Sequence, residues 1–360
     1  MTSSVDNSSD TGQLVEATAR KIMEASCSPE QLRAAEGTWN ESLWRELHDA
    51  SLTRALEPFG KGELGIPIDA ALNVMRLAGE YCAPAPLGES MLAHWLILLS
   101  GLPESEGPLS VAPVNGDDRL TLARTSTGWH LRGSAVRVPW ARYAQALVVC
   151  AQSEGGQFIA LVPAKSLKAV TPGENLAREP RDGVEFDSVL EEGAVRPFTA
   201  GRDYVYAVGA AMRVMQMAGA VEAALRMTVQ YVTHRKQFGR PLGKFQAVQQ
   251  SIAVIAANAA AARTAANSVV QLFSPQGSML GIAAAKLRTN EAVTIASKLA
   301  HQAHGAMGFT HEYALHFLTK RLWSWRDEFG NEAVWGRRLG GAVLQGGADN
   351  LWSLITAEMG

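Results

Sequence analysis

The sequence predicts three successive parts: a helical domain, a small β-domain and a C-terminal helical bundle. Three observations predict this order. Apolar residues recur at helical spacing through residues 11–105, they alternate with polar residues between turns through residues 108–197, and long helical stripes return from residue 203. We therefore expect domains at residues 1–106, 107–200 and 201–360.

The N-terminal part is predicted to be helical from its caps and apolar stripes. Ser28-Pro29-Glu30-Gln31 is a capping box with proline at the first helical position. Apolar residues at helical spacing follow at 43–52 and again at 72–78. These signals predict several amphipathic helices that pack on one another.

The middle part has the pattern of β-hairpins. Apolar residues alternate with polar ones at 120–122 and at 129–131, across a turn at 126–129. Two apolar runs at 146–150 and 158–162 flank a glycine-containing turn at 153–156. The spacing of these strands predicts a small, separate sheet.

The C-terminal part is predicted to consist of long helices. One apolar stripe extends from Val214 to Val232, and the alanine-rich segment 251–270 has high helix propensity. Further helices are expected at about 279–301 and 331–354. The segment between the first two helices, residues 235–245, must turn the chain because Gly239 and Pro241 interrupt the helical pattern.

Composition excludes several classes of function. The chain has 360 residues and a net charge of -2, so neither a nucleic-acid-binding surface nor a basic membrane-binding face is expected. The longest apolar run, 91–99, is too short to span a bilayer, and the N-terminus lacks the features of a signal peptide. Cys27, Cys82 and Cys150 lie far apart, which favours a reducing compartment. We expect a cytoplasmic protein.

Two motifs resemble functional sites without the context that those sites need. Residues 60–65 match the spacing GxGxxG, but no convincing strand precedes them, so we predict that they bind no dinucleotide. His301, His304, His311 and His316 lie close in sequence, but no carboxylate stands at metal-ligand spacing beside them. No metal site is therefore predicted.

The turn at residues 234–246 is the most informative segment. It combines cations, an aromatic ring and amides, which suit a large anionic and aromatic ligand: arginine for phosphate, phenylalanine for an apolar ring and amides for polar ring edges. An ordinary helix corner, with Lys and Arg near a helix C-terminus, would show part of the same pattern.

Two segments of the C-terminal part carry a family resemblance. Arg235-Lys-Gln-Phe-Gly239, with Gln246 eight residues after Phe238, resembles the flavin-binding signature of the acyl-CoA dehydrogenases. The stretch from Gln302 to Phe309, followed by Glu312-Tyr313, resembles a second stretch of that family. The resemblance implies the acyl-CoA dehydrogenase fold with a C-terminal four-helix bundle. It also implies an acyl-CoA substrate, electron-transfer flavoprotein as electron acceptor, and FAD bound between the subunits of a dimer or tetramer.

The resemblance also implies which residues contact FAD. Arg235 would meet the pyrophosphate, Gln246 would lie near the adenine end, and the turn would reach a flavin held mainly by the neighbouring subunit. Bare backbone N–H groups near Gly305 would suit phosphate oxygens. The implied cofactor-binding residues are Arg235, Gln237, Phe238, Gln246, Gln302, Gly305 and Ala306.

The catalytic carboxylate of that family is missing at both places where the resemblance would put it. The family removes the α-proton of an acyl-CoA with a Glu while the β-hydrogen leaves as hydride to the flavin. Counting from the motifs places Phe329 and Gly209 at the two base positions, and Glu328 lies one residue before the first. Ala210 stands where the family usually carries an arginine near the CoA. The β-domain segments expected to touch the flavin, 111–117 and 136–140, also depart from the family's pattern.

If the chain is an FAD-dependent relative of the acyl-CoA dehydrogenases, its role has four possible interpretations. The chain is a homomeric enzyme whose base has shifted to Glu328 (or Asp327), or one subunit of a heteromeric bacterial enzyme. It could instead be a non-catalytic partner that only completes the FAD site of a sister chain, or an acyl-CoA oxidase or flavin monooxygenase on the same fold.

Overall fold

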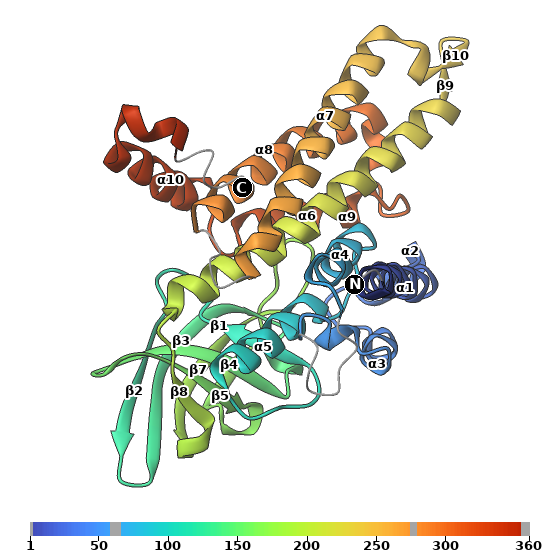
Figure 1. Cartoon of the computed structure of the whole chain (residues 1–360). Coiled ribbons are helices and arrows are strands. Elements are labelled where there is room, and N and C mark those ends of the chain that lie inside the picture. Colours follow the sequence, from blue (N-terminus) through green and yellow to red (C-terminus); the bar gives the residue numbers. More distant parts are fainter. Residues whose placement is uncertain (1–2, 58–65, 274–278, 354–360) are drawn as a thin grey trace.

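The computed structural model describes residues 3–57, 66–273 and 279–353, and Figure 1 shows three regions that follow the predicted order. The glycine motif at 60–65 lies outside the described residues. The N-terminal helices are α1 (Ser3–Ser26), α2 (Pro29–Ala34), α3 (Glu41–Asp49), α4 (Ile68–Glu80) and α5 (Leu87–Ser100). The predicted capping box is confirmed, because the Gln31 N–H donates to Ser28 Oγ at 3.3 Å and the Ser28 N–H donates to Gln31 Oε1 at 2.8 Å.

The middle region is one mixed sheet. Its strands are β1 (Leu109–Ala112), β2 (Arg119–Thr125), β3 (Gly128–Pro139), β4 (Ala146–Ser153), β5 (Gly156–Pro163), β6 (Ala169–Thr171), β7 (Arg181–Leu190) and β8 (Val195–Pro197). They run in the order β6-β7-β3-β2-β4-β5-β8, with β1 parallel to β4. Both predicted hairpins are confirmed: Leu122 pairs with Leu131 across β2 and β3, and Val148 pairs with Leu161 across β4 and β5.

The C-terminal region is the predicted helical bundle. Its helices are α6 (Gly201–His234), α7 (Gln246–Ser268), α8 (Met279–His304), α9 (Leu315–Asp327) and α10 (Glu332–Gly346). Helix α6 packs against α7, α8 and α9, whereas α10 packs mainly on α8. The helix predicted over 331–354 is interrupted, because Gly347 has φ of 74° and a 3-10 turn follows at Ala348–Asn350, after which residues 351–353 are helical again.

The two helical regions share one hydrophobic core, although the sheet separates them in sequence. Helices α4 and α6 come together where glycines replace side chains. A Cβ on Gly219 would lie 2.0 Å from the Arg76 carbonyl oxygen, and one on Gly79 would lie 1.9 Å from that of Gln216. A second core lies on the sheet and holds apolar residues such as Leu122, Leu131 and Val149. The predicted boundaries at 106/107 and 200/201 fall in the segments that connect these regions.

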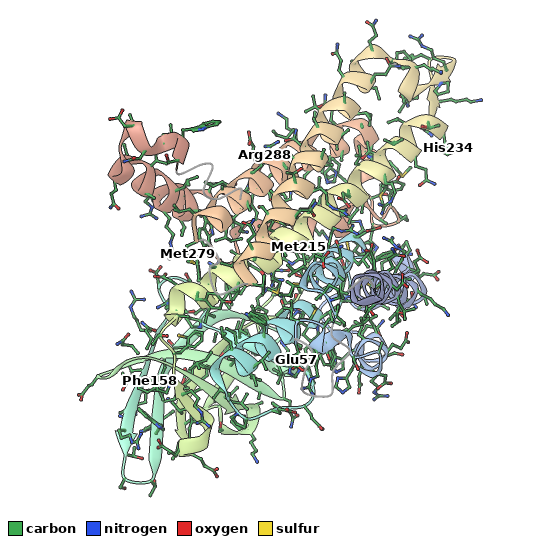
Figure 2. All side chains as sticks on the ribbon, in the orientation of Figure 1. Glu57, Phe158, Met215, His234, Met279 and Arg288 are labelled. Carbon is green, nitrogen blue, oxygen red and sulfur yellow. The ribbon has the colours of Figure 1, made fainter. Side chains whose placement is uncertain are left out.

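Figure 2 shows the long axis of the molecule: His234, the last residue of α6, lies at the outer end of the bundle, and Phe158 of β5 lies in the sheet at the opposite end. Within the described ranges, no helix has both the length and the apolar character that crossing a membrane requires.

Candidate functional site

The turn between α6 and α7 is a small hairpin at the outer end of the bundle (Figure 1). Strand β9 (Lys236–Gln237) pairs antiparallel with β10 (Arg240–Pro241), and the two linking residues, Phe238 and Gly239, have φ of 52° and 79°. Left-handed φ at both positions is the geometry of a tight two-residue hairpin. Glycine adopts it freely, whereas a bulky residue is strained there by about 1–3 kcal/mol.

Phe238 combines this strain with exposure, because 89% of its surface is open, and its ring lies nearly perpendicular to that of Phe245 with the centroids 6.2 Å apart. Backbone strain persists where the surrounding structure imposes it, and it concentrates at functional positions. An exposed aromatic ring at the end of a rigid hairpin suits contact with another molecule.

Three polar side chains of this turn remain unpaired in the described part of the chain. Arg235, Gln237 and Gln246 are exposed, and none of their side chains has a hydrogen-bond partner there. Helix α7 begins at Gln246 without a side-chain cap, so within the described residues its first two N–H groups, those of Gln246 and Ala247, are also open. Open N–H groups at a helix N-terminus beside an unpaired guanidinium favour an anion.

The second predicted stretch lies at the same end of the bundle. Helix α8 ends at His304, whose ring stacks on Tyr231 of α6 with centroids 4.4 Å apart. A 3-10 turn, η7 (Gly305–Phe309), follows directly, and Gly305 has φ of 59°. Gln302, Gly305 and Ala306 are all exposed. The structure therefore brings both predicted FAD segments to the outer end of α6 and α8.

Two hollows connect this end of the bundle with the sheet. The outer groove, about 830 Å³, is lined by Leu176, Ser297, Lys298, His301, Gln302, Gly305, Phe309, His311, His316, Thr319, Lys320 and Trp323. The inner pocket, about 490 Å³, is lined by Val114, Asn115, Arg137, Glu174, Asn175, Leu176, Arg181, Tyr206, Trp323, Ser324, Arg326, Asp327, Glu328 and Phe329. Leu176 and Trp323 line both, so the two hollows adjoin.

Glu328 lies at the wall of the inner pocket, in a buried network of charges. Its carboxylate accepts from Arg181 Nε at 2.6 Å and from Arg213 Nε at 2.7 Å. Arg213 also donates to Glu89 at 2.7 Å, and Arg181 donates to Glu179 at 2.9 Å. The network joins α5, α6 and β7 to the end of α9.

These arginines determine the protonation of the carboxylates. Burial alone would raise the pKa of Glu328, but the charges of Arg181 and Arg213 outweigh it and hold the pKa below its ordinary value. Glu179 behaves in the same way, with its pKa lowered to about 2 by Arg181 and Arg321 despite burial. A carboxylate with a lowered pKa is a weak base, and both oxygens of Glu328 already accept hydrogen bonds from arginines.

Phe329 and Gly209, the residues at the two positions where the family resemblance would put the catalytic base, contact each other. Phe329 is 1% exposed, and its ring packs against Gly209 so closely that a Cβ there would lie 2.3 Å from the ring carbon Cδ1. Trp335 Nε1 donates to the Phe329 carbonyl at 2.9 Å and so fixes this turn. An aromatic ring therefore occupies the first position, and it leaves the second no room for a side chain.

The β-domain loop beside the pocket is held by its own hydrogen bonds. Asp118 accepts from the N–H groups of Asn115 and Val136 at 3.2 and 3.1 Å, and Arg202 of α6 donates to the Asn115 and Asp118 carbonyls at 2.6 and 2.8 Å. Arg137 lies at the register shift in β3 with φ of 57° and lines the inner pocket. This wall is therefore cationic and polar.

Sequence reasoning missed the charged network, although it left a signal. Arg213 interrupts the apolar stripe of α6, and Glu89 lies in a helix that is otherwise mostly apolar. A charge in such a stripe is rarely buried without a partner. The partners Arg181 and Glu179 lie on and just before β7, and only the fold brings them to the same place.

The three cysteines are buried, and burial raises the pKa of Cys27 and Cys150 to about 12 and that of Cys82 to about 11. These thiols are therefore unreactive as nucleophiles.

Comparison with known proteins agrees with this geometry. The family model "Acyl-CoA dehydrogenase, C-terminal domain" matches residues 205–337. The chain is 28% identical to the acyl-CoA dehydrogenase FadE27 of Mycobacterium tuberculosis over 343 residues, covering 85% of this chain and 89% of that protein. It is 26% identical to acyl-CoA dehydrogenase IpdE2 of the same organism, covering 86% and 90%.

Among solved structures, the Tcur3481-Tcur3483 steroid ACAD G363A variant superposes with a TM-score of 0.85 and 26% identity, covering 94% of this chain and 99% of that one. The ChsE4-ChsE5 complex of Mycobacterium tuberculosis, at 23% identity, shares the fold with a TM-score of 0.82 and coverage of 92% and 96%. The C-terminal part of the chain therefore matches the acyl-CoA dehydrogenase family, and most of the chain is similar to members of that family, which are FAD-dependent flavoprotein oxidoreductases.

Proposed function

We propose that this chain is the non-catalytic subunit of a heteromeric acyl-CoA dehydrogenase, in which it completes an FAD site while a sister chain supplies the base. One observation carries the proposal: the first counted base position is a buried Phe329, and its ring packs so closely on Gly209 that this second position has no room for a carboxylate side chain. The nearest carboxylate, Glu328, is held by Arg181 and Arg213.

The relatives support a subunit role. Two of the similar solved structures carry titles that each name two proteins, Tcur3481-Tcur3483 and ChsE4-ChsE5. The chain also exposes large apolar side chains at Phe238, Phe309 and Leu344, which suit burial against another subunit. Because one of these structures is titled a steroid ACAD, we propose a bulky, steroid-derived acyl-CoA as the substrate class of the assembled enzyme.

The outer end of the bundle fits FAD. The proposed contacts are Arg235, Gln237, Phe238, Gln246, Gln302, Gly305 and Ala306. Arg235 and the open N–H groups of α7 would bind phosphates, and Phe238 would cover an apolar ring face. When bound, FAD supplies the acceptor for the hydride that leaves the acyl chain. This chain's part is to bind and orient the cofactor and to exclude water from it.

The main alternative keeps the base in this chain. Glu328 lines the inner pocket, so a homomeric enzyme would use it, or less favourably Asp327, to remove the α-proton. Paired with two arginines, Glu328 would have to leave one of them before it could take a proton. An oxidase or monooxygenase on the same fold would use oxygen in place of electron-transfer flavoprotein. We keep electron-transfer flavoprotein as the acceptor and the cytoplasm as the location in our proposal.

The test compares the chain purified alone with the chain co-expressed with a homologous sister chain. We expect little FAD and no acyl-CoA-dependent bleaching of flavin by the single chain under anaerobic conditions, and both properties in the co-purified complex. If the single chain holds FAD and bleaches promptly, and Glu328→Gln abolishes the bleaching while the variant stays folded and keeps its FAD, the homomeric alternative is correct. Rapid reoxidation of the bleached flavin in air would indicate an oxidase.

The proposed FAD-binding surface at the outer end of the bundle can be tested with a matched pair of arginine variants. In the complex, Arg235→Ala should reduce the FAD retained after gel filtration without changing the urea midpoint, because this guanidinium has no partner in the described part of the chain. Arg124→Ala in the β2–β3 hairpin, which removes an exposed guanidinium paired with Glu192, should leave FAD retention unchanged. Equal FAD loss in both variants, or in neither, would argue against the assigned surface.

A further inference from the structure

We propose that Glu36, His311 and His316 form a binding site for a divalent transition metal such as Zn²⁺, at the edge of the outer groove. Glu36 follows α2, His311 precedes α9, and His316 lies in the first turn of α9. Each side chain offers one ligand atom, and these atoms all lie within 4.8 Å of one another. A carboxylate with two imidazoles is a ligand set that Zn²⁺ takes in proteins, with a further position left open.

His316 supports the site most strongly. Its Nδ1 lies 2.8 Å from the Tyr313 carbonyl oxygen, which can only accept a hydrogen bond, so Nδ1 carries the proton and Nε2 keeps a free lone pair. The residue is 6% exposed, and Nε2 is buried without a hydrogen-bond partner in the described part of the chain. Leaving a buried acceptor unsatisfied costs about 1–3 kcal/mol. A histidine whose other ring nitrogen donates to a backbone carbonyl is the usual arrangement of a metal ligand.

Glu36 and His311 complete the cluster from the exposed side. His311 Nε2 lies 3.6 Å from Glu36 Oε2, and Lys320 Nζ lies 4.0 Å from the other carboxylate oxygen, Oε1. An ion pair between Glu36 and a protonated His311 would account for these two residues without His316. It leaves the buried Nε2 of His316 unexplained, whereas a shared cation accounts for all three.

The geometry needs only a modest closure. Ligand bonds of about 2.1 Å in a tetrahedral site place ligand atoms roughly 3.4 Å apart. The 4.8 Å limit on the present separations can be closed from the His311 side, because that side chain is exposed whereas His316 is fixed in the first turn of α9. The bound ion would tie the segment after α2 to the start of α9. Its open position would be available to a water or a ligand oxygen at the edge of the outer groove, which His311 and His316 line.

The test uses the full chain without a polyhistidine tag, stripped with EDTA and titrated with ZnCl₂ by calorimetry. We expect one equivalent to bind, and His316→Gln and Glu36→Gln each to weaken binding by at least about tenfold. Glu36→Gln changes a partly exposed residue, so it reports on binding even if His316→Gln is unstable. A Co²⁺ titration gives a second readout, because d–d absorption of tetrahedral intensity indicates ligation by the protein.

The matched control is His130→Gln. His130 Nε2 lies 2.6 Å from the carboxylate of Asp187 in the sheet, so this variant also removes a histidine paired with a carboxylate, far from Glu36 in the fold. It should bind Zn²⁺ as the unchanged chain does. The proposal is overturned if Zn²⁺ fails to bind, if binding survives in both Glu36→Gln and His316→Gln, or if His130→Gln weakens it equally.

Discussion

Glu328→Gln is expected to destabilise this protein even though it preserves the shape of the side chain. The substitution removes the negative charge that Arg181 and Arg213 share at 2.6 and 2.7 Å. Removing one partner of a buried ion pair costs about 3–5 kcal/mol. Arg213 keeps Glu89 and Arg181 keeps Glu179, so we expect the lower end, about 3 kcal/mol. This corresponds to a roughly hundredfold larger unfolded fraction.

The assay is urea unfolding followed by tryptophan fluorescence, with Asp327→Asn as the matched control. Asp327 is the adjacent carboxylate, but its side chain is 52% exposed and its contact with Arg326 is 3.7 Å, so its loss should cost under about 1 kcal/mol. The pKa of Glu328 is lower in the folded protein than in the unfolded chain. The ionised carboxylate therefore contributes fully to stability at pH values above the ordinary carboxyl pKa, and this contribution is lost as the pH falls through the lowered pKa. Equal midpoints for Glu328→Gln and the unchanged chain at pH 7 would refute the assignment of Glu328 to a structural network.

Two further predictions concern neighbouring parts of the core. Gly209→Ala should destabilise by about 1–3 kcal/mol because its Cβ would overlap the Phe329 ring, and the penalty should shrink in a Phe329→Leu background; equal urea-midpoint penalties in both backgrounds would contradict the contact. Burial lowers the pKa of Lys286 from 10.5 to about 7, so between those values the unfolded chain binds more protons and stability should rise with pH. Lys286→Met should lack this rise, by up to about 1.4 kcal/mol per pH unit. Urea midpoints of both proteins at pH 7, 8 and 9 test this, and a constant difference between them would count against it.

The order of secondary structure could be predicted from the sequence because its signals are local. The capping box at Ser28, the β2–β3 hairpin and the stripe from Val214 to Val232 depend on neighbours within a few residues along the chain. The turn at 235–245 was equally local, since Gly239 and Pro241 cannot continue a helix. The interruption of the last predicted helix shows the limit of such reasoning, because the break at Gly347 does not disturb the apolar pattern before it.

The sequence by itself determined the three-part fold and the composition of the hairpin turn, because helix periodicity, strand alternation and turn chemistry depend on residues that are close together in the sequence. Only the tertiary structure decided what surrounds Glu328: Arg181 and Arg213 come from β7 and α6. It alone placed Phe329 on Gly209, and it alone brought Glu36 beside His311 and His316, whereas the sequence showed no carboxylate at metal-ligand spacing from these histidines. Charge pairing, steric exclusion and metal ligation depend on distances in space, and residues far apart in the chain acquire those distances only when the core forms.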